Sequence, residues 1–256
     1  TSARTPLDEL PDSPPLDAYP AVKQVIAAFG SPQLQSQSTL GGELCQRPRC
    51  WYFRNGYGLT AAAGLVERCE NRYHAIFGND GAAKFVPPSR LAPALVALGA
   101  EIRVIGPGEE ARLPLESLYR APRDESQSEL VLEPNQLLTH VRLPKSGAAN
   151  ASYEVLHGAG PDYPLVACST TLELVGGVAR SAQIVLGQVA PVPWMSAPAA
   201  EALVGKPVTL QTAREAGEAA VAWATPLSDN AYKVRLAKVA VERSILLAAG
   251  LDHGGF

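Results

Sequence analysis

GSPQLQSQSTLGGELCQRPRCWYFRNG, residues 30–56, combines two signals that seldom belong to one site. Thr39 to Gly42 include two adjacent glycines, whose bare backbone lets a phosphate or a ring approach closely. Cys45 and Cys50 follow directly, with arginines between them, as in a metal-binding loop. The stretch therefore predicts a cofactor loop, an iron–sulfur site or only a tight turn, and the rest of the chain has to decide among these.

The composition limits the class of protein. The 256 residues are 46% hydrophobic and 18% charged, as in an ordinary globular protein with an ample core. A net charge of -3 and the lack of a lysine–arginine run argue against nucleic-acid binding. No apolar stretch reaches transmembrane length, and the start, TSARTPLDELPDSPP, has no apolar signal core. We expect no membrane insertion and a cytoplasmic location, or a periplasmic one if a partner subunit carries the export signal.

The first half of the sequence predicts short helices, a hairpin and a long loop. Helices are expected to begin at Thr5–Leu7 and to run over Tyr19–Phe29. Residues 54–84 are rich in glycine and asparagine without periodicity, which predicts a long loop that is either functional or faces a partner. Ser89 caps the apolar helix LAPALVAL, and EIRVI and ARLPL predict two strands around the turn GPGEE. The polar stretch RAPRDESQS, residues 120–128, indicates a domain boundary.

The second half places strands before helices. Four strands are predicted at LLTHVRLP (137–144), SYEVL (152–156), VACSTTLELV (166–175) and SAQIVLGQVA (181–190), and the glycine pair at 176–177 makes the last two a hairpin. Three helices follow, over Ala197–Val204, Thr212–Trp223 and Asp229–Ala249, the last capped by Ser228. Strands followed by segregated helices predict an α+β fold, with a sheet covered on one face.

The histidines and cysteines favour structural roles over a metal site. His74, His140, His157 and His253 are scattered along the chain. An iron–sulfur cluster usually takes four thiolates, whereas only three cysteines share the loop-rich region. Cys168 lies in an apolar strand and is expected to be a packed, reduced thiol. We therefore expect no metal ligands in this chain.

The stretch quoted first resembles the second FAD-binding segment of the flavoprotein subunits of molybdenum hydroxylases. That family includes xanthine dehydrogenase, carbon monoxide dehydrogenase and bacterial aldehyde oxidoreductases, and its pattern is A-S-P-Q-x-R-N-x-x-T-x-G-G-N. Here the same place reads GSPQLQSQSTLGGE. The resemblance continues through ENRYHAIFGNDGAAKFVPPSRLAPALVALGAEIRVIGP, LEPNQLLTHVRLP, YEVLHGAGPDYPLV and PLSDNAYKVRLAKVAVERSIL, and so spans nearly all of the chain.

The resemblance implies an α+β fold in two domains. The first, residues 1–122, is a partial FAD-binding domain of the molybdenum hydroxylase flavoprotein type. The second, residues 128–252, is the flavoprotein C-terminal domain, an antiparallel sheet packed on helices. Family members carry a further subdomain before this point, with a first glycine-rich FAD loop, whereas this sequence begins at Thr1 and has its only methionine at Met195. We therefore expect a truncated FAD clamp and weak FAD binding by the chain alone.

The resemblance also implies how the glycine segment meets FAD. Thr39, Leu40, Gly41 and Gly42 are expected to hold the pyrophosphate and ribityl region through backbone amides, with the Thr39 hydroxyl as a further donor. Glu43 stands in the place of the family's asparagine. It removes amide donors and adds a negative charge beside a phosphate.

The remaining cofactor-binding positions are carried over singly. Ser89 and Arg90 occupy the place of a Ser–Asp pair that contacts FAD. Leu138 matches an apolar residue near the cofactor, and Gln33 matches a glutamine upstream of the glycines. Some relatives hold a four-iron cluster in the loop after the glycines, but this chain keeps too few of those cysteines to complete one.

In function, the resemblance implies an FAD-dependent oxidoreductase subunit of a heterotrimeric complex. Electrons would pass from a 2Fe–2S subunit through FAD to an acceptor, while a molybdenum-cofactor subunit selects the substrate. No residue of this chain is expected to act as a catalytic acid, base or nucleophile. Two alternatives stay open: an FAD-free scaffold subunit of the same complex, and an iron–sulfur protein that uses Cys45, Cys50 and Cys69 with an outside ligand.

Overall fold

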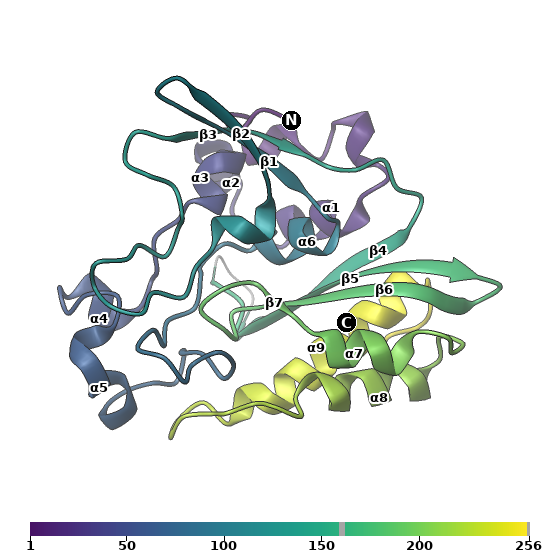
Figure 1. Cartoon of the computed structure of the whole chain (residues 1–256). Helices are drawn as coiled ribbons and strands as arrows, with labels where there is room; N and C mark the ends of the chain where they lie inside the picture. The colour runs from purple at the N-terminus through teal and green to yellow at the C-terminus, as the bar shows by residue number, and fades with distance from the viewer. Residues whose placement is uncertain (159–161, 255–256) are drawn as a thin grey trace.

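Two antiparallel sheets organise the residues described in this computed structural model, 1–158 and 162–254 (Figure 1). The first sheet has three strands in the order β2-β1-β3, and the second has four in the order β4-β5-β6-β7. Helices accompany both sheets. The α+β class predicted from the sequence is therefore confirmed.

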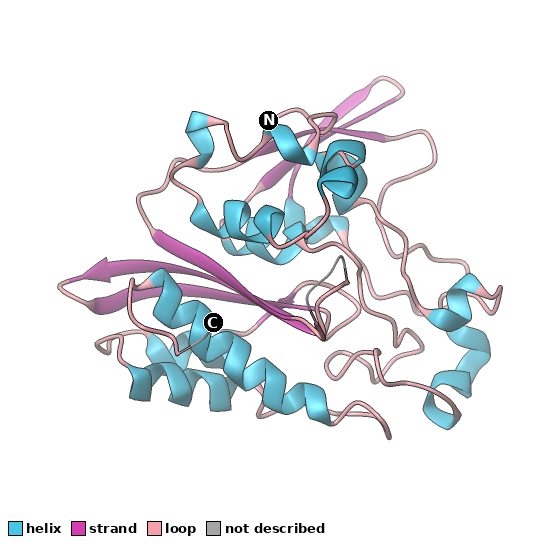
Figure 2. Ribbon diagram, turned by 180° about the vertical axis from the view of Figure 1, so that it is seen from behind, coloured by secondary structure: helices cyan, strands magenta, loops and turns pink. Residues whose placement is uncertain are grey.

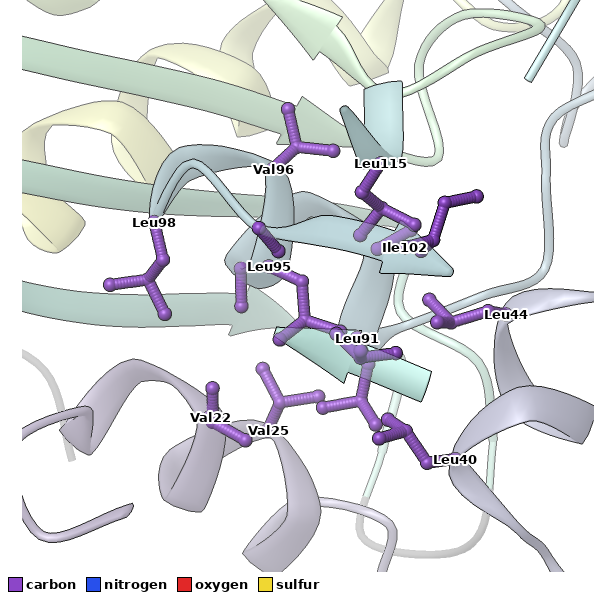
Figure 3. Close-up of a cluster of buried hydrophobic side chains, with 14 of the residues drawn as sticks. Val22, Val25, Leu40, Leu44, Leu91, Leu95, Val96, Leu98, Ile102 and Leu115 are labelled. Atoms are coloured by element: carbon purple, nitrogen blue, oxygen red, sulfur yellow. The ribbon is translucent and has the colours of Figure 1, made fainter. Parts of the chain in front are cut away.

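Short helical segments and the three-stranded sheet build the first half. The helix α6 (Leu91–Ala97) lies at its centre, and all of its residues are buried. Figure 3 shows Leu40 and Leu44 directed toward Leu91 of this helix. The other elements of this half are η1 (Leu7–Glu9), η2 (Pro14–Leu16), α1 (Pro20–Ala27), α2 (Pro32–Gln37), α3 (Leu40–Leu44), β1 (Glu101–Gly106), β2 (Glu109–Pro114), η3 (Leu115–Leu118) and β3 (Leu137–Arg142).

Strand β3 belongs to the first sheet, although its sequence was grouped with the second half. It runs antiparallel to β1, with Val141 opposite Ile102 and Arg142 opposite Glu101. Val141 and Ile102 are both buried in the core around α6. The polar stretch 120–128 therefore lies between two strands of one sheet.

The second sheet is covered on both faces, whereas the sequence predicted one covered face. Helices α7 (Ala197–Leu203), α8 (Leu210–Ala220) and α9 (Tyr232–Ala248) lie along one face (Figure 2). On the other face α1 packs against β4, and α6 packs against β5 and β6. A Cβ atom at Gly187 would lie 2.6 Å from Pro93 of α6, so this close approach requires glycine. The strands are β4 (Ala149–Val155), β5 (Val166–Val175), β6 (Val178–Gly187) and β7 (Trp194–Met195).

The hairpin between β5 and β6 forms where it was predicted. Gly176 and Gly177 connect the strands with φ angles of 58° and 80°, which favour glycine. Helix α9 starts three residues later than expected, because the residues that looked like its cap have other partners. Asn71 donates to the Ser228 hydroxyl at 2.8 Å, and the Asp229 amide donates to Asn71 at 2.9 Å.

Residues 50–88 form a lobe at the side of both sheets (Figure 1), and this lobe contains residues 54–84, for which the sequence predicted a long loop. Within it lie α4 (Trp51–Arg54) and α5 (Ala61–Arg68). Glu125 accepts hydrogen bonds from the backbone amides of Leu59, at 2.9 Å, and Thr60, at 2.6 Å. The polar stretch 120–128 therefore fastens the lobe to the first half. Within the described residues, no helix combines the length and the apolar surface that crossing a lipid bilayer requires.

Candidate cofactor site

The glycine segment is the first turn of α3 rather than a bare loop. Thr39 caps this short helix, since its hydroxyl accepts the Gly42 amide at 3.1 Å. The backbone carbonyl of Thr39 accepts the Glu43 amide at 2.8 Å. The Gly42 amide, one of the donors expected to face a phosphate, is thus used inside the helix.

The N-terminal segment takes up two more amides of this turn. Leu40 donates to the carbonyl of Thr5 at 3.0 Å, and Gly41 donates to the carbonyl of Ala3 at 2.7 Å. A Cβ atom at Gly41 would lie 2.8 Å from the Cβ of Ala3. Close packing against Ala3 therefore explains the glycine at position 41, without any cofactor. At Gly42 a Cβ atom would lie 3.0 Å from the Thr39 hydroxyl.

Gly42 faces a cavity of about 360 Å³ beside the first turn of α3. Both halves of the chain contribute to its wall, the second half through Tyr163. Four of the nine residues predicted to bind the cofactor line it: Thr39, Gly42, Glu43 and Arg90. The other lining residues are Phe29, Leu34, Gln37, Ser38, Gln46 and Tyr163.

Glu43 is buried, with 1% of its surface exposed, and its carboxylate caps α6. The backbone amides of Arg90 and Leu91 donate to its Oε1 at 2.6 and 3.3 Å. Burial raises the pKa of Glu43 to about 7, because desolvation outweighs these stabilising hydrogen bonds. The negative charge expected beside a phosphate is therefore directed toward a helix N-terminus, and it is only partly formed at neutral pH.

Arg90 joins the two halves rather than standing free in the cavity. Its guanidinium pairs with the buried carboxylate of Glu154 on β4, with Nε 3.0 Å from Oε1. It also donates to the carbonyl of Ala28 at 2.8 Å and lies 4.7 Å from the ring centre of Phe29. Its charge is thus balanced within the protein.

Five predicted residues do not line the cavity. Leu40 and Leu138 belong to the hydrophobic core, and Gly41 packs on Ala3. Ser89 accepts the Ala92 amide at 3.1 Å, as expected for a residue that caps α6. Gln33 lies on α2, where it accepts the hydroxyl of Ser31.

Of the six lining residues that were not predicted from the sequence, Gln46 and Tyr163 form hydrogen bonds that lead to Glu43. The Tyr163 hydroxyl donates to Oε1 of Gln46 at 2.8 Å, and Nε2 of Gln46 donates to Oε2 of Glu43. Tyr163 lies in YEVLHGAGPDYPLV, a stretch already assigned to the family pattern, so its place there was an available signal. Gln46 carried none.

A second cavity, of about 540 Å³, lies between the lobe and the second half and also touches Tyr163. Cys50 and His74 meet in its wall, with Sγ 3.2 Å from Nε2. Burial raises the pKa of the Cys50 thiol and lowers the pKa of His74 to about 4, so this pair is neutral at neutral pH. No group of three or more histidine, cysteine or acidic side chains gathers in the described part of the chain in a way that could hold a metal ion.

Lys233 of α9 lies behind this second cavity and is buried. Its ammonium group donates to the backbone carbonyls of Tyr73, His74 and Gln188 at 2.9, 3.2 and 2.8 Å. Burial lowers the pKa of Lys233 to about 7, while the three carbonyl acceptors favour its charged form. The side chain thereby fastens the lobe to the second half.

Comparison with known proteins gives two family matches. Residues 2–146 match the FAD binding domain in molybdopterin dehydrogenase, and residues 151–248 match the CO dehydrogenase flavoprotein C-terminal domain. The chain is 30% identical over 232 residues to the aldehyde oxidoreductase FAD-binding subunit PaoB of Escherichia coli, covering 86% of this chain and 68% of that protein. It is also 30% identical over 188 residues to the carbon monoxide dehydrogenase medium chain of Afipia carboxidovorans, covering 71% and 62%.

Solved structures show the same fold. Quinoline 2-oxidoreductase from Pseudomonas putida matches with a TM-score of 0.71 at 21% identity, over 97% of this chain and 73% of the other. Carbon monoxide dehydrogenase from Hydrogenophaga pseudoflava matches with a TM-score of 0.71 at 22% identity, over the same shares. The chain thus spans roughly two thirds to three quarters of the proteins that it matches.

Proposed function

Since the chain belongs to the family of FAD-binding subunits of molybdenum hydroxylases, we propose that it holds FAD beside Thr39 and Gly42 and passes electrons onward from the other subunits of its complex. The single observation that carries the location is the cavity at the first turn of α3, which both halves of the chain line. When bound, FAD supplies the redox chemistry, and the protein supplies placement and electrostatics.

The residues present fit part of FAD. A volume of about 360 Å³ is at the small end of ligand pockets, roughly 300–1,000 Å³, so this cavity accommodates a portion of the dinucleotide. The Thr39 hydroxyl accepts the Gly42 amide and keeps its own hydrogen for a ligand. Gln37, Ser38 and Tyr163 add further polar groups at the wall. Side chains, rather than the amides of Leu40 and Gly41, are thus the proposed donors here.

The proposed partners are a 2Fe–2S subunit that delivers electrons and a molybdenum-cofactor subunit that binds the substrate. PaoB is described as an FAD-binding subunit, and the carbon monoxide dehydrogenase homologue as a medium chain, so both relatives work beside other chains. We also propose two domains, with a junction that differs from the one expected at residues 122–128. The pairing of β3 with β1 and the family matches over 2–146 and 151–248 favour a junction near residues 147–150.

One observation favours a second candidate, an FAD-free scaffold subunit of the same complex. The amides of Leu40 and Gly41 are already bound to the N-terminal segment, and Arg90 is neutralised by Glu154. Fewer free donors and no free cation then face the cavity from these positions. The two candidates differ in one measurable property, the amount of FAD in the assembled complex.

The test uses Thr39→Ala in the purified complex, with Thr209→Ala as the matched control. Thr209 caps α8 in the same way, since its hydroxyl accepts the Thr212 amide, but it does not line the cavity. Each change removes one helix cap and costs about 1 kcal/mol of stability. We expect Thr39→Ala alone to lower the FAD released per protein on acid treatment. Equal FAD in both variants would remove this cavity from the site, and a flavin-free wild-type complex would favour the scaffold.

A further inference from the structure

A hydrogen-bonded chain connects the buried carboxylate of Glu43 to the wall of the cavity. Glu43 accepts from the side-chain amide of Gln46, and Gln46 accepts from the hydroxyl of Tyr163 at 2.8 Å. All three residues line the cavity, and Tyr163 also lines the second one. This hydrogen-bonded chain of Glu43, Gln46 and Tyr163 therefore runs from a buried titratable carboxyl group to a hydroxyl that a ligand can reach.

The protonation state of Glu43 fixes the direction of every bond in this chain. An ionised carboxylate can only accept, so Gln46 must turn its NH₂ group toward Glu43 and its carbonyl toward Tyr163. Tyr163 then donates to Gln46 and offers only lone pairs to the cavity. This is the arrangement seen in the structure.

A proton on Glu43 reverses the chain without moving its heavy atoms far. Oε2 of Glu43 then donates to the carbonyl of Gln46, after a half-turn of the amide that exchanges its oxygen and nitrogen. The NH₂ group of Gln46 now donates to the oxygen of Tyr163. The hydroxyl hydrogen of Tyr163 is released, and it can donate to a ligand in the cavity.

The groups around Glu43 leave it free to titrate near neutral pH. From α6, Arg90 presents its backbone amide, while its guanidinium is paired with Glu154 of β4. Tyr119, which donates to the carbonyl of Leu44, has a pKa raised well above 10 by burial, and burial also raises the pKa of the Cys45 thiol. Both therefore stay neutral. The pKa of Glu43 itself, raised to about 7 by burial, lies in the range where the chain can reverse.

We propose that Glu43 is a positioning residue which, through Gln46, decides whether Tyr163 offers a hydrogen-bond donor or only an acceptor to the cofactor cavity. Resting on the proposed function, this makes FAD binding a proton-linked event. The diphosphate of FAD only accepts hydrogen bonds, so it is bound best when Tyr163 can donate. Binding therefore takes up one proton at Glu43, and affinity falls as the pH rises.

The test measures FAD binding by flavin fluorescence between pH 6 and pH 9, in the chain alone and in its assembled complex. For one linked proton, the dissociation constant should rise about tenfold per pH unit above the midpoint of Glu43. Glu43→Gln should flatten this profile, because glutamine accepts from the amides of Arg90 and Leu91 and also donates to Gln46, as protonated Glu43 does. Tyr163→Phe should flatten the pH profile as well, because this substitution removes the hydroxyl at the end of the hydrogen-bonded chain.

Glu129→Gln is the matched control. Glu129 is also a buried carboxylate, but it does not belong to the hydrogen-bonded chain, and it pairs with Arg47 at 2.7 Å. This variant should keep the wild-type slope. A slope that survives in Glu43→Gln, or a flat profile in the wild type, would overturn the proposal.

A second measurement needs no cofactor. Infrared difference spectra of the free chain should show a protonated carboxyl band that titrates near pH 7 and is absent in Glu43→Gln. The absence of this band in the wild type would also overturn the proposal. A complex that holds no FAD at any pH would instead refute the proposed function. The infrared titration alone would then test whether Glu43 titrates within the hydrogen-bonded chain.

Discussion

The buried pair of Arg90 and Glu154 predicts a large and specific loss of stability when it is broken. Only 2% and 4% of these two side chains are exposed, and Nε of Arg90 lies 3.0 Å from Oε1 of Glu154. Arg90→Met leaves the carboxylate of Glu154 buried without a partner and frees the carbonyl of Ala28. Removing one partner of such a pair costs about 3–5 kcal/mol, because an uncompensated buried charge remains.

Replacing both partners should recover most of that loss. In Arg90→Met with Glu154→Leu no charge is buried, and double replacements of this kind are often neutral. Urea denaturation of the four proteins of this double-mutant cycle at pH 7.5 measures the coupling free energy directly. A loss below about 1 kcal/mol in Arg90→Met, or a double variant as unstable as the single one, would refute our reading of this pair as the contact that joins the two halves.

Three further predictions concern the glycine turn, Glu43 and the lobe. Gly41→Ala should destabilise the chain more than Gly42→Ala, because its new Cβ would lie 2.8 Å from Ala3, and thermal denaturation would show the reverse order if the packing argument is wrong. Without cofactor, the free energy of unfolding should fall by about 3 kcal/mol as the pH rises from about 4.5 to about 7. The reason is that folding raises the pKa of Glu43 to about 7, so only the folded state keeps the proton between these pH values. Denaturation of Glu43→Gln should show a smaller dependence, and an unchanged curve would contradict the assignment. Cys50→Ser should leave the metal content and the visible spectrum unaltered, and iron that is present in the wild type and lost in this variant would contradict the neutral thiol.

Local patterns in the sequence predicted the elements whose causes are local. The apolar strand VACSTTLELV and the glycine pair after it placed the β5–β6 hairpin, and the apolar run in LAPALVAL placed α6. The fold class followed from the order of strands and helices. The partner of β3 did not, because pairing with β1 depends on contacts far apart in the chain.

The same distinction between local patterns and long-range contacts applies to the candidate site. The family pattern selected Thr39, Gly42, Glu43 and Arg90, all of which line one cavity. The family pattern did not indicate that Gly41 packs against Ala3, or that Glu43 caps a helix that begins nearly fifty residues later. Those facts depend on which segments pack together in three dimensions. Motif spacing does not contain that information.

The three carbonyl oxygens that converge on the ammonium group of Lys233 have a consequence for local unfolding. They come from two segments, the lobe and the residue after β6, while the lysine itself comes from α9. If any one of the three segments separated, the ammonium group or its carbonyl acceptors would remain buried without their hydrogen bonds. They should therefore open together, so that amide hydrogen exchange in residues 73–77 and in the first turns of α9 proceeds at one common rate.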